Sequence, residues 1–567
     1  MASDNASEWR TGLGWVPNNE DDETGRYLSS DDAFAELVPG DGWDGPTDDP
    51  DPVGNDSMPG WDAKAIARWD VVPYQTVSGN FEIGLLAFHM NGIERIDVSL
   101  EDGPWQSLRE MHENPRTGIR EYVAVIPGDT DTAISDGLVE LRAIAYPEGA
   151  GTPRLLDSLF LFVNNHGTLD GPIIYVAKSG NDSTGDGSQN NPYATVRQAL
   201  NVCGSGIDDY EGATIRIEEA GRYDVDQPAQ PVRNTRWITI EGADGLSRDD
   251  VVIAAGSTAD YVRPNTQRLR FTNVSIDFSD MYQMYKEDPH QQWYDNCRWF
   301  YGQGWTYTPP ASLCPVRNVG YGGLFVTDSG STDSIYAFIN CNLVRNSHVE
   351  RISGDVFQNS LMVVGCSVDT VDGTVMSHHS DLFQYFGVYD NLIVYDINAA
   401  SIKSTQNFFL DHANTTFTNC AFVNISVQDV ESDPPFSQLN STQEHVLFFH
   451  VSNPGQRFVL RDDMNGAGKF VAKNVIFRNN VVERIQAAGY FDPIPAGVSI
   501  ESCHFNYNAP TGDNPTVGAI EIINSSGSEF EYRGIGASQI LGSALHIPGY
   551  SDSDSPDRGA TSWRLPR

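Results

Sequence analysis

Basic residues are scarce in this chain of 567 residues, and lysine is the scarcest of them. Lysine and arginine together number 36 against 77 aspartates and glutamates, which leaves a formal net charge of -41. Only six of the 36 are lysines, so 30 are arginines. A protein that grips a phosphate backbone needs a basic face, so this composition excludes a nucleic-acid-binding protein. Many acids with few lysines favour a halophilic protein that stays soluble in salty surroundings, and an acidic marine protein fits almost as well.

Long hydrophobic runs are also missing. The sequence has no stretch of about 18 apolar residues, which a membrane-spanning helix requires, so we expect no membrane insertion. Residues 1–14 carry neither a basic flank nor an apolar stretch, and they do not have the pattern of a secretory signal. The rest of the chain has the features of an extracellular surface protein. We therefore expect release by cell lysis, as for a virus particle, or a leader that is missing from this sequence.

The seven cysteines lack the spacing of a metal site. The sequence contains no CxxC pair and no Cys/His cluster, so we expect no zinc, and the acidic runs lack the spacing of a calcium-binding loop. No other metal and no cofactor is predicted. Five of the cysteines occur at one place in the repeated segment described next. We predict that they are buried and behave as small hydrophobic side chains.

A short step recurs through the second half of the chain: a polar or small residue, usually Asn, followed by Cys or an apolar residue that enters a strand. The steps are Asn273-Val274, Asn296-Cys297, Asn340-Cys341, Gly365-Cys366, Asn391-Leu392, Asn419-Cys420, Asn474-Val475 and Ser502-Cys503. Their second residues are 23, 44, 25, 26, 28, 55 and 28 positions apart, so the two long intervals each hide one copy. A period of this length is typical of a solenoid. The copies are too short for helix pairs and rich in Val, Ile, Phe and Asn, which predicts stacked strands, hence a parallel β-helix.

The composition divides the chain into four parts. Residues 1–60 are rich in Asp, Gly and Pro and are predicted to form an extended acidic docking arm. Short alternating strands between 61 and 168 predict an antiparallel β-sandwich, which resembles immunoglobulin/fibronectin-like modules, although it lacks their Cys–Trp–Cys signature. The β-helix is predicted over 169–548, and 549–567 is predicted to be a C-terminal tail.

Residues 173–202 resemble the opening of right-handed parallel β-helix proteins of the pectate-lyase-like superfamily. The matching features are a strand at Tyr175-Val176, a Gly/Asp/Ser-rich turn at 179–187, the step Pro192-Tyr193-Ala194-Thr195 and a short capping helix at 196–202. The resemblance implies this all-β fold over about 170–545. It implies little about activity, because the fold hosts lyases, hydrolases, isomerases and inert viral spikes. The whole layout resembles tailed-virus tailspike and fibre proteins.

A repeated Asp-x-Phe-Gln motif supplies the candidate catalytic residues. Asp355 and Asp381 are 26 residues apart, and Asn407 follows at the same interval, which predicts one column, with Phe357, Phe383 and Phe409 in another. Carboxylates on adjacent coils, about 5 Å apart, suit a retaining glycosidase. We therefore name Asp355, Asp381 and His379 as candidate catalytic residues, and Gln358 and Gln384 as candidate carbohydrate contacts. The alternatives are structural stacking at a bend, which an inward Phe column would require, and a calcium site.

A run of aromatic residues between positions 281 and 310 predicts a side loop with exposed rings. Flat rings suit sugars, because both bury apolar faces while their polar edges stay wet. The candidate carbohydrate-binding residues of this run are Trp293, Tyr294, Trp299, Tyr301, Trp305 and Tyr307. Packing within the chain or against a neighbouring subunit is the alternative.

Together these features predict a virion surface spike that contacts host-surface polysaccharide and degrades it if the carboxylates are active. We expect a homotrimer whose N-terminal arm binds other virion proteins, since an open solenoid end favours association. Two alternatives stay open at this stage. One is a secreted polysaccharide-degrading hydrolase or lyase, and the other is an inert decoration protein of a virus particle.

Overall fold

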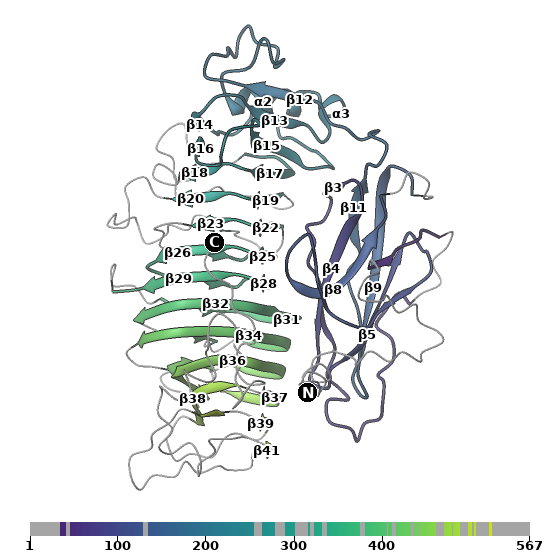
Figure 1. The fold of residues 1–567 in the computed structure, drawn as a ribbon, viewed down its shortest axis with the longest axis vertical. Helices are drawn as coiled ribbons and strands as arrows, with labels where there is room; N and C mark the ends of the chain where they lie inside the picture. The colour runs from purple at the N-terminus through teal and green to yellow at the C-terminus, as the bar shows by residue number, and fades with distance from the viewer. Residues whose placement is uncertain are drawn as a thin grey trace, which may run out of the picture.

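Stacked strands dominate this protein. The computed structural model describes residues 34–40, 46–128, 134–254, 264–277, 290–300, 316–317, 323–331, 337–374, 380–404, 406–410, 415–432, 436–439, 441–460, 470–478, 480–487, 497–501, 504–505 and 521–523. Within them, 30 strands of the second part pair into one continuous parallel sheet that winds around a central core (Figure 1). The predicted parallel β-helix is confirmed, while its right-handed winding and the superfamily relationship stay predictions. Neither described helix is long and apolar enough to cross a membrane.

The β-helix has three stacks of strands, and the longest strands pass through two or all three of them. The first sheet contains β12 (Ile173–Val176), β13 (Thr214–Ile217), β15 (Ile238–Gly242), β17 (Arg268–Thr272), β19 (Gln291–Asp295), β22 (Leu324–Thr327), β25 (Leu343–Arg345), β28 (Met362–Val364), β37 (Val471–Arg478), β39 (Val498–Glu501) and β41 (Glu521–Ile523). The second sheet contains β14 (Gly221–Asp224), β16 (Val251–Ala254), β18 (Ser275–Asp277), β20 (Arg298–Phe300), β23 (Gly330–Ser331), β26 (His348–Ile352), β29 (Ser367–Asp372), β38 (Val481–Ala487) and β40 (His504–Phe505).

The third sheet contains β21 (Val316–Arg317), β24 (Phe338–Ile339), β27 (Phe357–Gln358), β30 (Phe383–Gln384), β33 (Phe408–Phe409) and β35 (Phe436–Gln438). The strands β32 (Ile393–Ser404), β34 (Thr416–Ser432) and β36 (Thr442–Leu460) bend from the first sheet into the second, and β36 continues into the third, where its end pairs with β35. Strand β31 (Val388–Asp390) pairs with the start of β34.

The recurrent asparagines lie at two corners of the coil rather than in one column. Strand register aligns the corner between the first and second sheets over eight coils, and all eight residues have positive φ: Asn273, Asn296, Asp328, Asn346, Gly365, Asp396, Asn424 and His450. The corner that enters the first sheet has Asn340, Asn359, Asn391, Asn419, His445 and Asn474, also with positive φ. Glycine and asparagine tolerate this left-handed conformation best. The recurrent steps that the sequence analysis placed in one column therefore belong to two different corners.

The length of one circuit varies more than the sequence predicted. Arg298 pairs with Gly330, 32 residues later, whereas Gly330 pairs with His348 after 18 residues and His348 with Ser367 after 19. Differences are taken up outside the paired strands, because the strands must keep their register for their side chains to stack. A period near 25 is thus an average over unequal coils.

Aromatic and aliphatic side chains fill the β-helix core. Phe338, Phe357 and Phe383 stack with ring centroids 5.6 Å apart, and Phe408 follows at 5.0 Å. The predicted column ended on Phe409, which is wrong by one residue, because Phe383 pairs with Phe408. Four of the five cysteines predicted to be buried are buried, at positions 297, 341, 366 and 420, and Cys203 is buried as well. The fifth, Cys503, lies outside the described residues, as does Cys314.

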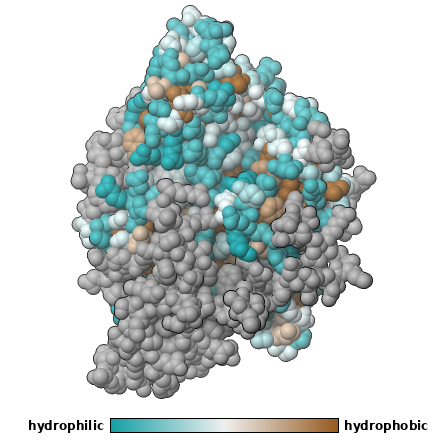
Figure 2. Space-filling model, viewed as in Figure 1, coloured by the Kyte–Doolittle hydropathy of each residue, from teal (hydrophilic) through white to brown (hydrophobic). Residues whose placement is uncertain are grey.

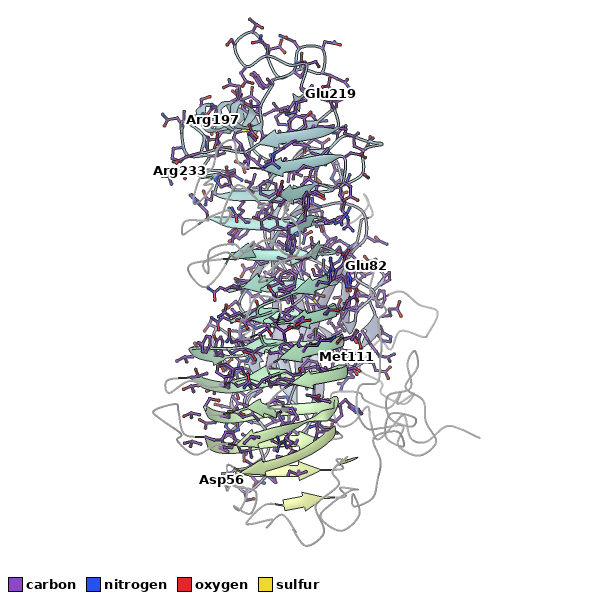
Figure 3. All side chains as sticks on the ribbon, turned by 90° about the vertical axis from the view of Figure 1, so that its left-hand side faces the viewer. Asp56, Glu82, Met111, Arg197, Glu219 and Arg233 are labelled. Carbon is purple, nitrogen blue, oxygen red and sulfur yellow. The ribbon has the colours of Figure 1, made fainter. Side chains whose placement is uncertain are left out.

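A short helix closes the N-terminal end of the coil. Helix α2 (Val196–Ser205) covers the predicted 196–202, and the hydroxyl of Thr195 caps it by accepting from the backbone N–H of Gln198 at 3.1 Å. Asp182 in the preceding turn accepts hydrogen bonds from Thr195. A second helix, α3 (Ile207–Tyr210), follows directly. Figure 3 shows Arg197, which is exposed, and Glu219, which is half-buried, at this end of the stacked coils.

Two sheets precede the β-helix. One contains β1 (Ala35–Glu36), β2 (Ile66–Trp69), β4 (Phe81–Phe88), β7 (His112–Glu113) and β8 (Arg120–Ile126). The other contains β3 (Thr76–Val77), β5 (Ile93–Leu100), β6 (Gln106–Leu108), β9 (Gly137–Pro147), β10 (Arg154–Leu155) and β11 (Leu159–Val163). Strand β1 pairs with β8, so part of the predicted arm belongs to this sandwich. The immunoglobulin-like relationship stays a prediction.

The sandwich lies along the β-helix and covers the outer face of its first sheet (Figure 1). Apolar side chains of that face join the sandwich core: Trp237, Trp293, Phe325, Leu343, Met362, Val364, Ile393, Tyr395, Ala421, Val423, Leu447, Phe449 and Ile476. Strands β4 and β8 are buried in nearly unbroken runs, because their sheet is covered on both faces. Strand β9 alternates, since it forms the outer layer.

Corner asparagines also bind the sandwich directly. The amide of Asn391 donates to the carbonyl oxygen of Ala67 and accepts from its backbone N–H, both at 2.7 Å. The side-chain oxygen of Asn419 accepts from the N–H of Lys64 at 3.0 Å. Asn391 and Asn419 occupy the same corner on adjacent coils, so this corner column follows the sandwich backbone from Ala67 to Lys64.

We predict that Asn391→Gly lowers the free energy of unfolding by about 1–3 kcal/mol, because it keeps the left-handed corner but removes both hydrogen bonds to Ala67. Chemical denaturation measures the loss. Asn273→Gly is the matched control, since Asn273 is a left-handed corner residue that hydrogen-bonds Leu246 within the coil. An equal loss in both variants would contradict a role of Asn391 in docking.

A buried charge cluster lies at the same interface. Arg345 of the β-helix donates to the carboxylate of Asp70 at 3.0 Å, and both side chains are almost fully buried. Glu121 lies beside them and accepts hydrogen bonds from Asn114 and Thr117, both at 2.9 Å. Burial raises the pKa of Glu121 well above its usual range, and the neighbouring Asp70 carboxylate raises it further.

A carboxyl whose pKa is raised by folding destabilises the folded state once pH exceeds its unfolded pKa. We therefore predict that stability falls as pH rises from about 4.3, the ordinary pKa of glutamate, through the raised pKa of Glu121. Glu121→Gln should flatten this part of the profile and raise stability at pH 7, because the amide stays neutral. Urea denaturation between pH 4 and 8 measures both effects, and an unchanged slope in the variant would refute them.

Candidate functional site

An open cavity of about 290 Å³ lies on the outer face of the second sheet, where three consecutive coils turn out of the first. It is lined by Arg248, Asn296, Arg298, Asp328, Ser329, Gly330, Ser331, Asn346, His348 and Glu350. We refer to it as the second-sheet pocket. Nearly all of its lining side chains are polar, whereas the first-sheet face on the other side of the corner is apolar and covered. Figure 2 shows that the described surface around the N-terminal coils is largely hydrophilic.

Coil register explains why a hollow forms here. Arg298, Gly330 and His348 occupy one outward column on β20, β23 and β26. Gly330 has no side chain, so the column has a gap between a guanidinium and an imidazole. An added Cβ at Gly330 would meet only a backbone oxygen of His348, at an ordinary 3.4 Å. The gap therefore results from the missing side chain and not from a tight backbone approach.

Opposite charges line the pocket in similar numbers. Arg298 pairs with Asp249 at 3.1 Å, and Arg248 donates to the side chain of Asn296 at 3.5 Å. Asp328 and Glu350 supply exposed carboxylates. These planar donors and acceptors fit hydroxyl and carboxylate groups of a bound molecule.

His348 connects the pocket to the next coil. Its Nδ1 lies 2.9 Å from the hydroxyl of Ser367, and its Nε2 lies 3.4 Å from a carboxylate oxygen of Asp369. Partial burial raises the pKa of Asp369, although the neighbouring imidazole pulls it down. Glu350 and Asp369 fall between paired residues of β26 and β29, so they occupy equal places on adjacent coils.

The predicted catalytic aspartates lie elsewhere, at a bend before the third sheet. Asp355 and Asp381 are 4% and 0% exposed. Asp355 accepts from the backbone N–H of Asp381 at 3.1 Å, and Asp381 accepts from that of Gln406 at 3.0 Å. The predicted third member, Asn407, is wrong by one residue, because Gln406 follows Asp381 in register. This geometry favours the structural reading, in which the carboxylates bind turn backbones, and their catalytic role stays a prediction.

The structure describes only some of the predicted carbohydrate-contacting residues. Gln358 donates to Gln384 at 3.1 Å, and Gln384 in turn donates to Asp381 at 3.3 Å, so both amides belong to the ladder at the bend. Of the candidate residues, His379, Tyr301, Trp305 and Tyr307 lie outside the described residues.

The described aromatic candidates are core residues, which corrects their predicted role. Tyr294 and Trp299 are 1% and 0% exposed inside the coil. Trp293 is 5% exposed and packs against Trp237 beneath the sandwich. Their strands β19 and β20 are regular parts of the coil, so residues 291–295 and 298–300 do not belong to the predicted side loop. Buried rings present no face to a sugar.

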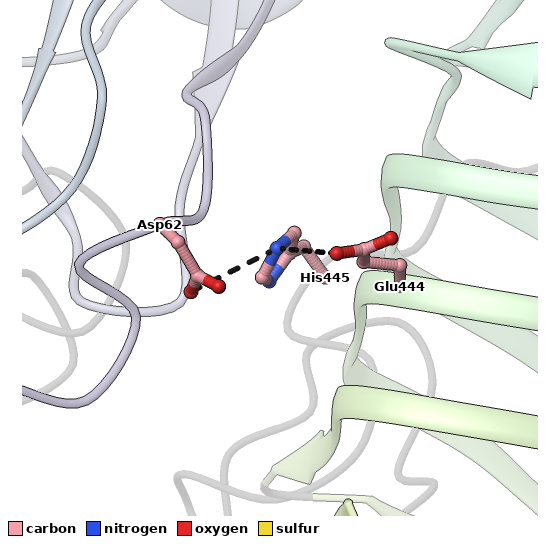
Figure 4. A group of neighbouring side chains, drawn as sticks. All are labelled: Asp62, Glu444 and His445. Atoms are coloured by element: carbon pink, nitrogen blue, oxygen red, sulfur yellow. Dashed lines mark ion pairs between the residues drawn. The ribbon is translucent and has the colours of Figure 1, made fainter.

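A second group of side chains has the composition of a metal site. Ligand atoms of Asp62, Glu444 and His445 lie within 4.8 Å of one another (Figure 4). However, the ammonium group of Lys473 lies 2.6 Å from Asp62 and 2.5 Å from Glu444. Burial lowers the pKa of His445, which limits its positive charge. We assign the group to an ion-pair network between sandwich and β-helix.

Sequence reasoning missed the second-sheet pocket. The three coils that line it are 32 and 18 residues apart, and the next coil follows after 19, so a search for intervals near 25 did not find them. The sequence contained one usable signal: Asn346-Ser347 and Gly365-Cys366 are two corner steps 19 residues apart. Recognising the first would have aligned His348 with Ser367 and Glu350 with Asp369.

No protein-family model matches this chain, and no curated protein is similar to it in sequence. Among solved structures it is similar to a GH136 lacto-N-biosidase from Eubacterium ramulus (11% identity, 62% of this chain, 68% of that chain, TM-score 0.29). It is also similar to a family 28 exopolygalacturonase from Yersinia enterocolitica (8% identity, 79% and 100%, TM-score 0.28). The catalytic domain of a GH87 α-1,3-glucanase matches with 11% identity, 82% and 91% coverage and a TM-score of 0.24. The β-helix assignment rests on the strand pairing of this chain itself.

Proposed function

We propose that this protein binds a polysaccharide chain in the second-sheet pocket. The observation that carries the proposal is the hollow at Gly330, which lies between Arg298 and His348 and is lined by planar polar groups. Such groups match the ring of hydroxyls around a sugar, and the cavity volume suits a unit of one or two rings. Guanidinium groups also bind carboxylate or sulfate in two-point contacts, so Arg248 and Arg298 extend the range of ligands from neutral to acidic glycans.

Coil stacking supports a polymer rather than a free sugar. Equivalent outward positions repeat about every 4.8 Å along the solenoid, which is close to the length of one sugar unit in an extended chain. The first sheet offers no such surface over the described residues, because the sandwich covers its outer face. A polysaccharide would therefore lie along the second sheet.

Two variants test the pocket by different means. Gly330→Leu should fill the hollow without removing a charge, and Arg298→Gln should remove one guanidinium. Affinity electrophoresis in gels that contain acidic bacterial or archaeal exopolysaccharides measures binding. We expect each variant to lose at least about tenfold in affinity, or about 1.4 kcal/mol.

Arg233→Gln is the matched control, because Arg233 is an exposed arginine near the N-terminal coils (Figure 3). It should retain the wild-type mobility shift. Equal binding by the wild type and both pocket variants would place the glycan elsewhere. Failure of the wild type to bind any glycan of the panel would refute the proposal.

We further propose that the protein presents this site on the surface of a virus particle, as a homotrimer whose N-terminal arm docks onto other particle proteins. The support is in the sequence: its strong acidity and its order of arm, sandwich and β-helix. An inert decoration protein would share this layout but would bind no glycan.

We predict a trimer in solution. Sedimentation equilibrium of the full chain should give three times the monomer mass of 62.4 kDa. Measurements in low and high salt separate true association from charge repulsion, since a net charge of -41 opposes assembly when screening is weak. A stable monomer at micromolar concentration in both buffers would contradict the prediction.

A further inference from the structure

We propose that Glu350 and Asp369 are the two carboxyl groups of a retaining glycoside hydrolase site at the edge of the second-sheet pocket, an inference that rests on the proposed polysaccharide binding. Glu350 lines the pocket, and Asp369 reaches back to His348 of the same pocket. Neither residue belongs to the Asp-x-Phe-Gln motif.

The spacing of the pair fits this chemistry. Val349 pairs with Val368 and Arg351 with Thr370, so Glu350 and Asp369 lie side by side on adjacent coils. Adjacent strands are about 4.8 Å apart. Retaining enzymes hold their carboxyl groups about 5–5.5 Å apart, whereas inverting enzymes need a wider gap for water.

The two carboxyl groups also have different surroundings. Glu350 is exposed on the pocket wall, which suits an ionised nucleophile. Asp369 is partly buried, its side chain is 38% exposed, and burial raises its pKa. Two carboxyl groups whose environments push their pKa values apart are suited to the separate tasks of nucleophile and acid.

The reaction has two balanced steps. The Glu350 carboxylate attacks the anomeric carbon as the glycosidic C–O bond breaks, and the Asp369 carboxyl gives its proton to the departing oxygen. A water molecule then attacks the anomeric carbon of the glycosyl–Glu350 ester, while Asp369 takes one of its protons and Glu350 leaves as a carboxylate. His348 touches Asp369 and acts as a positioning residue.

Asp355 and Asp381 are less suited to these steps. Each uses a carboxylate oxygen to accept a backbone N–H of the next coil, and both are buried. Glu350 and Asp369 therefore remain the better-placed pair for a substrate in the pocket.

The experiment uses the full chain and a polysaccharide that it binds in the gel assay. Reducing ends measure cleavage, and proton NMR of the first product measures the anomer. Glu350→Gln and Asp369→Asn should each reduce cleavage by at least about 100-fold and should still bind the polysaccharide. The first product released by the wild type should have the same anomeric configuration as the substrate. Azide should restore turnover to Glu350→Ala by forming a glycosyl azide of inverted configuration.

Asp372→Asn is the matched control, since Asp372 lies on the same strand β29 and only caps the turn at Thr374. It should cleave at the wild-type rate. Asp381→Asn, corrected for its folded fraction, should do so as well.

His348→Gln tests the positioning role through pH. His348 and Glu350 of β26 flank Asp369 on one side, and Ala400 of β32 lies in register on the other. Because His348 holds down the pKa of Asp369, its loss should move the alkaline limb of the kcat/KM profile to higher pH. A uniform loss of rate at every pH would remove this role.

The outcomes separate the two proposals. Binding by the wild type without cleavage overturns the hydrolase inference and leaves polysaccharide binding intact. Cleavage that persists in Glu350→Gln and Asp369→Asn overturns this assignment of residues, and loss of it in Asp381→Asn alone moves the site to the bend. An inverted product overturns the retaining mechanism. If the wild type neither binds nor cleaves any polysaccharide, the proposed function itself is contradicted.

Discussion

The whole β-helix depends on in-register pairing of each coil with the next. Parallel pairing places equivalent residues about 4.8 Å apart, so any side chain that recurs at one position becomes a column. At the corner between the first and second sheets, this forces the left-handed conformation on eight successive coils. Only residues that tolerate positive φ can follow one another there, and six of the eight are asparagine or aspartate. The register thus selects the residue type before any contact is considered.

Docking of the sandwich determines which surfaces remain for ligands. It buries the apolar outer face of the first sheet, and asparagines at the far corner hydrogen-bond its backbone. The interface also contains Arg345 and Asp70, whose separation would leave a charge unpaired in an apolar layer, a cost of about 3–5 kcal/mol. The sandwich is therefore part of one packed unit with the β-helix. The pocket that we propose for the ligand lies on the second sheet instead, where the lining is polar.

The sequence predicted what repeats and missed what does not. The Asn-Cys and Asn-Val steps predicted a coil of strands. They also predicted buried cysteines, because the residue after a corner enters the core. The same steps could not show that two corners were being sampled, since both need a left-handed residue. Phe409 was predicted in place of Phe408 because one coil is a residue shorter than its neighbour. Docking was also hidden, although the unbroken apolar strands β4 and β8 carried its signal.

Two sets of carboxylates illustrate how one fold gives stacked acidic side chains different surroundings. At the bend, Asp355 and Asp381 face backbone N–H groups, so their burial is compensated by hydrogen bonds and they stabilise the turn. Beside the pocket, Glu350 faces solvent and Asp369 faces an imidazole, so a substrate can compete for them. Both sets arise from stacking of acids on consecutive coils. What separates them is the neighbouring column: Gly330 has no side chain beside His348, which leaves a hollow next to the second pair.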